Sequence, residues 1–188
     1  ILRRAAKVAL TPPTGPVFIS LPGDILNMEA AIDMGESTRV DTAVRPSDAG
    51  LAQLAARLLQ AKNPVIIAGH EIIASDAFDE AAQLAEMLGA AVYQQTVNDG
   101  AHFPSEHPAF MGSLNRDQEY VRGKLAPHDL VICLGADLLR MSVYSPVDPL
   151  PSDLAVIQIG QRDWEMGKNH AVEIALRADV KETVAALL

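Results

Sequence analysis

The stretch NPVIIAGHEIIASDAFDEAAQLAEML, residues 63–88, decides the fold class. After Pro64 comes a short run of β-branched and small apolar residues, which is typical of a strand buried on both faces of a parallel sheet. Gly69 ends this strand, and apolar residues then recur at helical spacing up to Leu88. A second apolar run starts at Ala91. The stretch therefore predicts a β-α-β unit.

The rest of the chain repeats this alternation of strands and helices. Either Ser75 or Asp76 is expected to cap the helix of the first unit. Alternating buried strands and helices predict an α/β fold, a doubly wound Rossmann-like parallel sheet with helices on both faces. The predicted strands are 17–21, 64–68, 91–93, 130–134, 155–159 and 173–176, and the predicted helices are 1–10, 46–59, 75–88, 117–125 and 179–188.

The pattern also predicts three segments. Residues 1–23 carry a helix and a strand that have no continuing partner, so we expect them to be the C-terminal tail of a preceding domain. Residues 24–45 lose all periodicity and are predicted to be a linker. Residues 46–188 form the Rossmann-like domain. Because the chain opens on Ile1 within a helical pattern, we expect it to be a fragment of a longer protein.

Composition excludes several classes of protein. The formal net charge of −9 argues against a nucleic-acid partner, because such proteins need positive charge to neutralise phosphates. No apolar run approaches the roughly 18 residues of a membrane span. The single cysteine, Cys133, cannot form an intrachain disulfide, so a reducing, cytoplasmic compartment is expected. Its apolar strand predicts an inert core thiol.

A ligand of such a sheet binds beside the carboxyl ends of the strands. The residues that follow two predicted strands, Gly69 with His70 and Gly135 with Arg140, are therefore candidates for a nucleotide cleft. The first strand lacks the G-x-G-x-x-G that binds NAD, and the chain has no Walker lysine loop. His102 lies near a second histidine, but no further ligand follows at a typical spacing, so no metal site is predicted.

Several motifs resemble those of thiamine-diphosphate-dependent enzymes. The segment GPVFISLPGD, residues 15–24, resembles the motif that closes their first domain, and NPVIIAG, residues 63–69, resembles the first strand of their middle domain. HPAFMG (107–112), LGA (134–136) and MGKN (166–169) follow in the family's order. Among members, residues 135–146 look most similar to benzoylformate decarboxylases, followed by acetohydroxyacid synthases.

This resemblance implies a middle domain of the Rossmann-like kind that binds NAD or FAD in other proteins. It lies between pyrimidine-binding and diphosphate-binding domains of the same chain. Residues 1–23 would be the tail of the pyrimidine-binding domain. The resemblance also implies a homo-dimer or tetramer, with thiamine diphosphate and Mg²⁺ bound outside these residues. His107 corresponds to the H-P motif of the family, and a catalytic contribution of His107 in the full enzyme follows as an expectation.

Two departures disfavour a flavin. The family's I-D-I-D strand end reads Ile159-Gly160-Gln161-Arg162, and the arginine that follows L-G-A in the synthases is Asp137. We therefore expect the central structural domain of a 2-oxo acid decarboxylase or lyase of the benzoylformate decarboxylase type, inactive by itself. The alternatives are an acetohydroxyacid-synthase-like carboligase whose middle domain binds FAD or ADP, and a stand-alone regulatory or assembly module.

Overall fold

The computed structural model describes residues 1–12, 14–33, 35, 38–142 and 144–188. It divides the chain into two compact units, Ile1–Thr42 and Ala43–Leu188. The three predicted segments, 1–23, 24–45 and 46–188, remain a prediction. Within the described residues, no helix combines the length and the apolar character that crossing a membrane requires.

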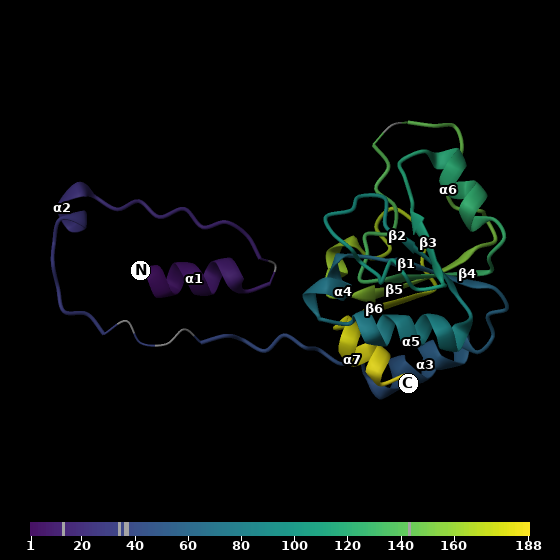
Figure 1. Cartoon of the computed structure of the whole chain (residues 1–188), viewed down its shortest axis with the longest axis horizontal. Coiled ribbons are helices and arrows are strands. Elements are labelled where there is room, and N and C mark those ends of the chain that lie inside the picture. The colour runs from purple at the N-terminus through teal and green to yellow at the C-terminus, as the bar shows by residue number, and fades with distance from the viewer. Residues whose placement is uncertain (13, 34, 36–37, 143) are drawn as a thin grey trace. The chain divides into compact units, whose positions relative to one another are not determined.

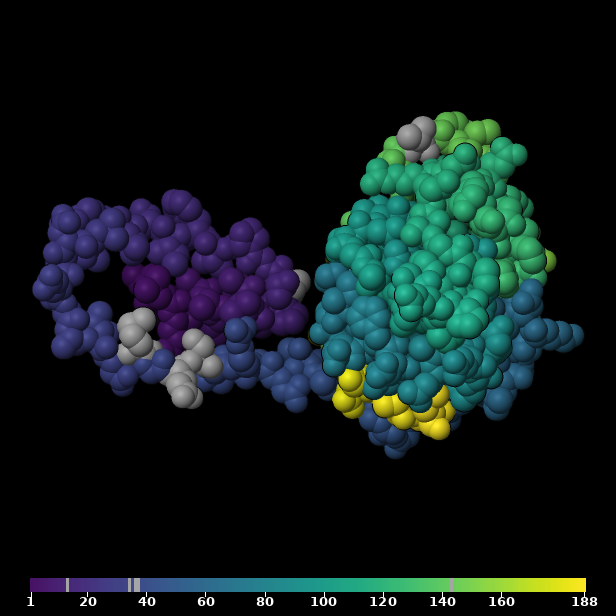
Figure 2. Space-filling view, viewed as in Figure 1, coloured from purple at the N-terminus to yellow at the C-terminus, as the bar shows by residue number. Residues whose placement is uncertain are grey.

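The first unit contains two helices, α1 (Leu2–Leu10) and α2 (Gly23–Leu26). The predicted helix at residues 1–10 is thus confirmed, but the predicted strand at 17–21 is wrong, because residues 14–22 have no regular secondary structure. Phe18 is 92% exposed. A strand needs a hydrogen-bonded neighbour, and the described residues of this unit provide none. Figure 2 shows this segment as a thin run of atoms around α1, whereas residues 43–188 pack densely.

The second unit is built on one parallel sheet of six strands in the order β3-β2-β1-β4-β5-β6. This order is that of a doubly wound Rossmann-like sheet, whose crevice lies where the order reverses, between β1 and β4. The predicted fold class is confirmed. The strands are β1 (Pro64–Ala68), β2 (Ala91–Gln94), β3 (Phe110–Ser113), β4 (Leu130–Leu134), β5 (Ala155–Gly160) and β6 (Ile174–Arg177).

Helices cover both faces of this sheet (Figure 1). Successive residues of a strand point to opposite faces of the sheet. Ile66 and Ile132 pack in the core between the sheet and α3, α4, α5 and α7. Val65 and Val131 pack on the other face, in the core covered by α6. The central strands β1 and β4 are apolar on both sides because both faces of the sheet are covered. The helices are α3 (Asp48–Leu58), α4 (His70–Ala74), α5 (Phe78–Leu88), α6 (Gln118–Leu125) and α7 (Val180–Ala185), with a 3₁₀ turn η1 (Asp163–Glu165).

The short elements α2, α4, β3 and η1 were not predicted from the sequence, and one predicted cap is wrong. Residues 70–74 form α4 directly after Gly69, so Ser75 ends that helix and does not begin the next. The N-cap of α5 is Ala77, without a side-chain hydrogen bond. The strand β3 lies at the edge of the sheet, where its residues alternate between half-buried and exposed. It therefore lacks the continuous apolar run by which the other strands were predicted.

Asp129 ties the connection between α3 and β1 to the start of β4. Its carboxylate accepts hydrogen bonds from the backbone N–H groups of Lys62 (2.7 Å) and Asn63 (2.9 Å). Burial opposes ionisation of this carboxyl, but the two backbone donors outweigh it and hold the pKa of Asp129 below its usual value. The ionised form is therefore the one that the fold stabilises.

We expect Asp129→Ala to lower the free energy of unfolding by about 1–2 kcal/mol at pH 7, because two backbone donors lose their charged acceptor. The folded-state pKa is the lower one, so this contribution is present above the unfolded pKa of about 3.9 and is lost as the pH falls through the folded value. Urea unfolding followed by circular dichroism at pH 7 and pH 3 measures it. The exposed Asp153→Ala is the control, and equal losses in both variants would contradict the assignment.

Candidate functional site

The candidate site is a cleft at the carboxyl edge of the sheet. It has a volume of about 160 Å³ and receives residues that follow β1, β2, β4 and β5. This position is the topological switch point between β1 and β4, where doubly wound sheets bind ligands. The lining residues are His70, Glu71, Gln95, Thr96, Val97, Asp99, Gly135, Ala136, Asp137, Arg140 and Arg162.

Two glycines allow the turns after β1 and β4 to touch at the base of this cleft. The N–H of Gly69 donates to the carbonyl of Leu134 (3.0 Å), and the N–H of Glu71 donates to that of Gly135 (3.0 Å). A Cβ on Gly69 would collide with the backbone of Gly135 and Ala136. Gly135 itself has a φ of +58°, which side-chain-bearing residues rarely adopt. The cleft therefore rests on a backbone crossing that only glycine permits at residue 69.

Glu71 extends from α4 under the end of β5. Its carboxylate accepts a hydrogen bond of 2.6 Å from the N–H of Gln161. A Cβ on Gly160 would lie 2.7 Å from the same carboxylate, so the strand end and the acid are in close contact. Burial raises the pKa of Glu71 above its usual value, although the Gln161 bond and the charge of Arg162 oppose the shift.

Asp137 lies between two arginines at the other side of the cleft. The guanidinium of Arg162 donates to both of its carboxylate oxygens, at 2.9 and 3.0 Å. The guanidinium of Arg140 forms an ion pair with the same carboxylate. The backbone N–H of Arg140 also donates to the hydroxyl of Thr96 (3.1 Å). The cationic groups of the cleft thus already have an anionic partner within the chain.

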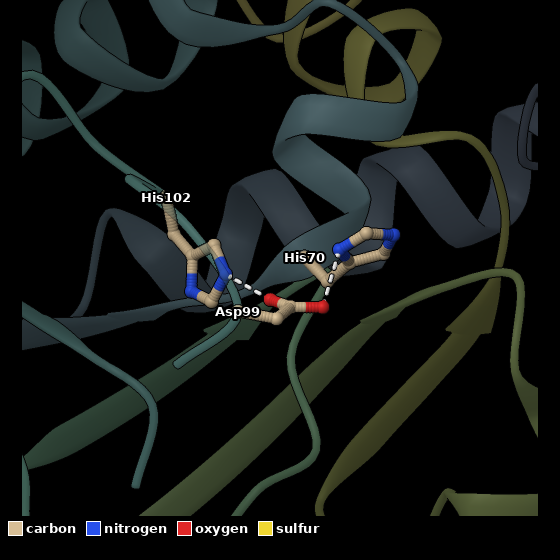
Figure 3. A group of neighbouring side chains, drawn as sticks. All are labelled: His70, Asp99 and His102. Carbon is tan, nitrogen blue, oxygen red and sulfur yellow. Dashed lines mark hydrogen bonds and ion pairs between the residues drawn. The ribbon is translucent and has the colours of Figure 1, made fainter. Parts of the chain in front are cut away.

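A third group of polar side chains lies at the rim of the cleft (Figure 3). His70 Nδ1 lies 2.9 Å from Asp99 Oδ2, and His102 Nε2 lies 2.6 Å from Asp99 Oδ1. The hydrogen bond with His102 holds the pKa of Asp99 below its usual value, and the nearby His70 acts in the same direction. One carboxylate therefore joins two imidazoles from the loops after neighbouring strands.

The structure brings together three of the residues predicted for the cleft. His70, Gly135 and Arg140 line it, and Gly69 lies directly behind it. His107 is not among the residues that line the cleft. It precedes β3, where its Nε2 lies 3.1 Å from Glu86 on α5, and its ring packs against Phe103. The catalytic contribution of His107 in a full enzyme stays a prediction.

Sequence reasoning missed Asp99, His102, Asp137 and Arg162 as site residues. The sequence order could have indicated the cluster of His70, Asp99 and His102. The loop that holds Asp99 and His102 follows β2, and His70 follows β1. Parallel neighbours bring such loops to one edge. Within its own loop, His102 has only His107 as a possible second ligand, so no metal site was predicted there. Cys133, by contrast, is buried as predicted, and burial raises the pKa of its thiol to about 12.

These observations define a Rossmann-like parallel domain with a polar cleft at its switch point. The family model described as thiamine pyrophosphate enzyme, central domain, matches residues 51–187. The chain therefore belongs to the thiamine-pyrophosphate-dependent enzymes and corresponds to their central domain. The resemblance read from the sequence motifs is confirmed.

Individual relatives agree with this assignment. The chain is 30% identical to a benzoylformate decarboxylase of Pseudomonas aeruginosa over 189 residues, covering 100% of the chain and 36% of the relative. It is also 30% identical to an acetolactate synthase large subunit of Corynebacterium glutamicum, covering 100% of the chain and 30% of the relative. The solved benzoylformate decarboxylase of Polynucleobacter necessarius superimposes with a TM-score of 0.84 at 29% identity, covering 99% of the chain and 35% of that structure.

Proposed function

We propose that this chain is the central domain of a thiamine-diphosphate-dependent decarboxylase or lyase that acts on 2-oxo acids, of the benzoylformate decarboxylase type. Its role is to hold apart the pyrimidine-binding and diphosphate-binding domains and to form one wall of the substrate site. The chain spans about a third of the length of its curated relatives, with shares of 36% and 30%. In this proposal, the catalytic cofactor binds to the pyrimidine-binding and diphosphate-binding domains, outside these residues.

The observation that carries this proposal is the charge and size of the cleft. Three carboxyl groups, those of Glu71, Asp99 and Asp137, face two guanidinium groups, so a diphosphate finds no excess of positive charge. The volume of about 160 Å³ is also below the roughly 300–1,000 Å³ of common small-molecule sites. The cleft is too small for thiamine diphosphate, and we assign no catalytic step to its residues.

The second candidate is a carboligase resembling acetohydroxyacid synthase, with FAD or ADP in the cleft. Two observations favour it: the similarity to an acetolactate synthase large subunit, and a cleft at the switch point, where Rossmann-like sheets bind nucleotides. The Asp137 carboxylate between Arg140 and Arg162 counts against it, because a phosphate would have to displace this carboxylate. A regulatory or assembly module that acts by itself is the third candidate.

The test compares the 188-residue chain with the full-length protein encoded by its open reading frame. Each is incubated with thiamine diphosphate, Mg²⁺ and benzoylformate, and carbon dioxide release is measured. We expect release from the full-length protein only. We also expect neither FAD nor ADP to bind the chain saturably in a calorimetric titration.

Each candidate predicts a different outcome of these measurements. Carbon dioxide release by the chain alone would overturn the assignment of a non-catalytic domain. Saturable FAD or ADP binding, with acetolactate formed from pyruvate by the full-length protein, would favour the carboligase. An open reading frame without a diphosphate-binding domain would favour the stand-alone module.

A further inference from the structure

We propose that His70, Asp99 and His102 form a binding site for a borderline divalent metal ion of the Zn²⁺ class. The inference rests on three converging side chains and does not depend on the reaction of the whole protein. One nitrogen of each histidine and an oxygen of the aspartate all lie within 4.8 Å of one another. These residues come from two segments, 70 and 99–102, that follow neighbouring parallel strands.

The donor set selects the kind of metal. Two imidazole nitrogens and one carboxylate oxygen suit Zn²⁺, Co²⁺, Ni²⁺ or Fe²⁺, whereas Mg²⁺ and Ca²⁺ prefer oxygen ligands alone. Around Zn²⁺, with bonds of about 2.0–2.1 Å, tetrahedral ligand atoms stand roughly 3.3 Å apart. His70 Nδ1 and His102 Nε2 lie 2.9 and 2.6 Å from the two oxygens of Asp99. These are hydrogen-bond distances and are shorter than that spacing, so the ligand atoms would have to move apart slightly to admit the ion.

One ligand of the site is held rigidly. The side chain of His102 is fully buried, and its backbone N–H donates to Oε1 of Gln94 at 2.8 Å. Its Nδ1 is buried without a hydrogen-bond partner among the described residues. The polar contact of this buried ring is therefore made through Nε2, the atom that faces the cluster. A buried ring held in this way is preorganised for a ligand at Nε2.

The other two ligands can adjust to an incoming ion. The side chains of His70 and Asp99 are 57% and 56% exposed, so small rotations of both can bring the ligand atoms to the spacing that an ion requires. Three protein ligands also leave at least one coordination position for water or for a molecule in the adjoining cleft. The bound ion would fasten the loop after β2 to the turn after β1.

Hydrogen bonds alone are the competing explanation for this cluster, because two neutral imidazoles can each donate an N–H to the carboxylate of Asp99. Metal binding distinguishes the two explanations directly. The test uses the protein without a histidine tag, treated with EDTA and dialysed. It is then titrated with ZnCl₂ at pH 7.5 by calorimetry, with 2 mM MgCl₂ present, and bound zinc is counted by mass spectrometry.

We expect the wild type to bind one Zn²⁺ per chain. In His70→Gln and in Asp99→Asn, the dissociation constant for Zn²⁺ should be at least tenfold larger. His128→Gln is the matched control, because His128 contacts the carbonyl of Asn63 and lies outside the cluster. Zinc at a hundredfold excess over its dissociation constant should raise the melting temperature of the wild type by about 5–10 °C. It should raise that of the two cluster variants by less.

The same measurements can refute the site. His70 and Asp99 are half-exposed, so both variants should fold, and circular dichroism without zinc verifies this. Absence of saturable zinc binding by the wild type would overturn the proposal. So would zinc binding by His70→Gln or Asp99→Asn that equals binding by the wild type and the His128→Gln control. Replacing zinc by Co²⁺ gives a second readout, since tetrahedral Co²⁺ absorbs visible light much more strongly than Co²⁺ in water, and the cluster variants should lack this increase.

Discussion

Gly69→Ala should lower the free energy of unfolding by about 3 kcal/mol or more, because the added methyl group meets backbone atoms that cannot move aside. The collision is with the carbonyl of Gly135 and the Cα of Ala136, in the turn after β4. Relieving it would separate β1 from β4 at the point where Gly69 donates to Leu134. The variant therefore disrupts the centre of the sheet and the base of the cleft together.

Urea denaturation followed by circular dichroism measures this loss, and the chain supplies a matched control. Gly123 lies inside α6, and a Cβ there would meet nothing within 4 Å. Gly123→Ala should therefore raise the free energy of unfolding by about 0.5–1 kcal/mol, since alanine is the better helix former. If the two variants changed stability in the same direction, the close approach at Gly69 would not be the cause.

The second large effect is expected from Phe103→Ala, which should lower the free energy of unfolding by about 3–5 kcal/mol. Phe103 is fully buried and packs against the rings of His107 (5.2 Å) and Phe110 (6.3 Å). It is also the residue after His102, so it anchors the loop that carries Asp99. Removing the ring leaves a cavity under that loop.

Two comparisons show whether packing is the cause. Phe103→Leu keeps most of the buried volume and should lose less than half as much stability as the alanine variant. Tyr144 is 90% exposed, so Tyr144→Ala should change the free energy of unfolding by no more than about 0.5 kcal/mol. A loss in Phe103→Ala that matched the loss in Tyr144→Ala would contradict the buried role of this ring.

The sheet could be predicted largely from local patterns. Strands such as β4 are continuous apolar runs because they are buried on both faces, and that composition is visible in the sequence. The pattern was misleading at residues 17–21, which are also largely apolar but have no neighbouring strand among the described residues. It was silent at β3, whose edge position leaves Met111 half exposed and interrupts the apolar run.

The candidate site could be predicted only in outline. The edge of the sheet that carries ligands follows from the alternation of strands and helices. His70, Gly135 and Arg140 were therefore predicted to lie there, and all three line the cleft. The cluster of His70 with Asp99 and His102 depends on which strands are neighbours. Strand order is a tertiary property that the local sequence does not contain, because β1 pairs with both β2 and β4.

The buried amide of Gln94 has a consequence for how the edge of the sheet assembles. Its oxygen accepts from the backbone of His102, and its nitrogen donates to the hydroxyl of Ser113 at 3.2 Å. Gln94 and Ser113 are also paired residues, at the point where the alignment of β2 with β3 shifts. A slip of one residue between β2 and β3 would take the hydroxyl of Ser113 away from this amide, at a cost of about 1 kcal/mol for the lost hydrogen bond. Gln94 thus helps to fix the register of the edge strand β3 against β2, since β3 has little buried apolar surface of its own to do so.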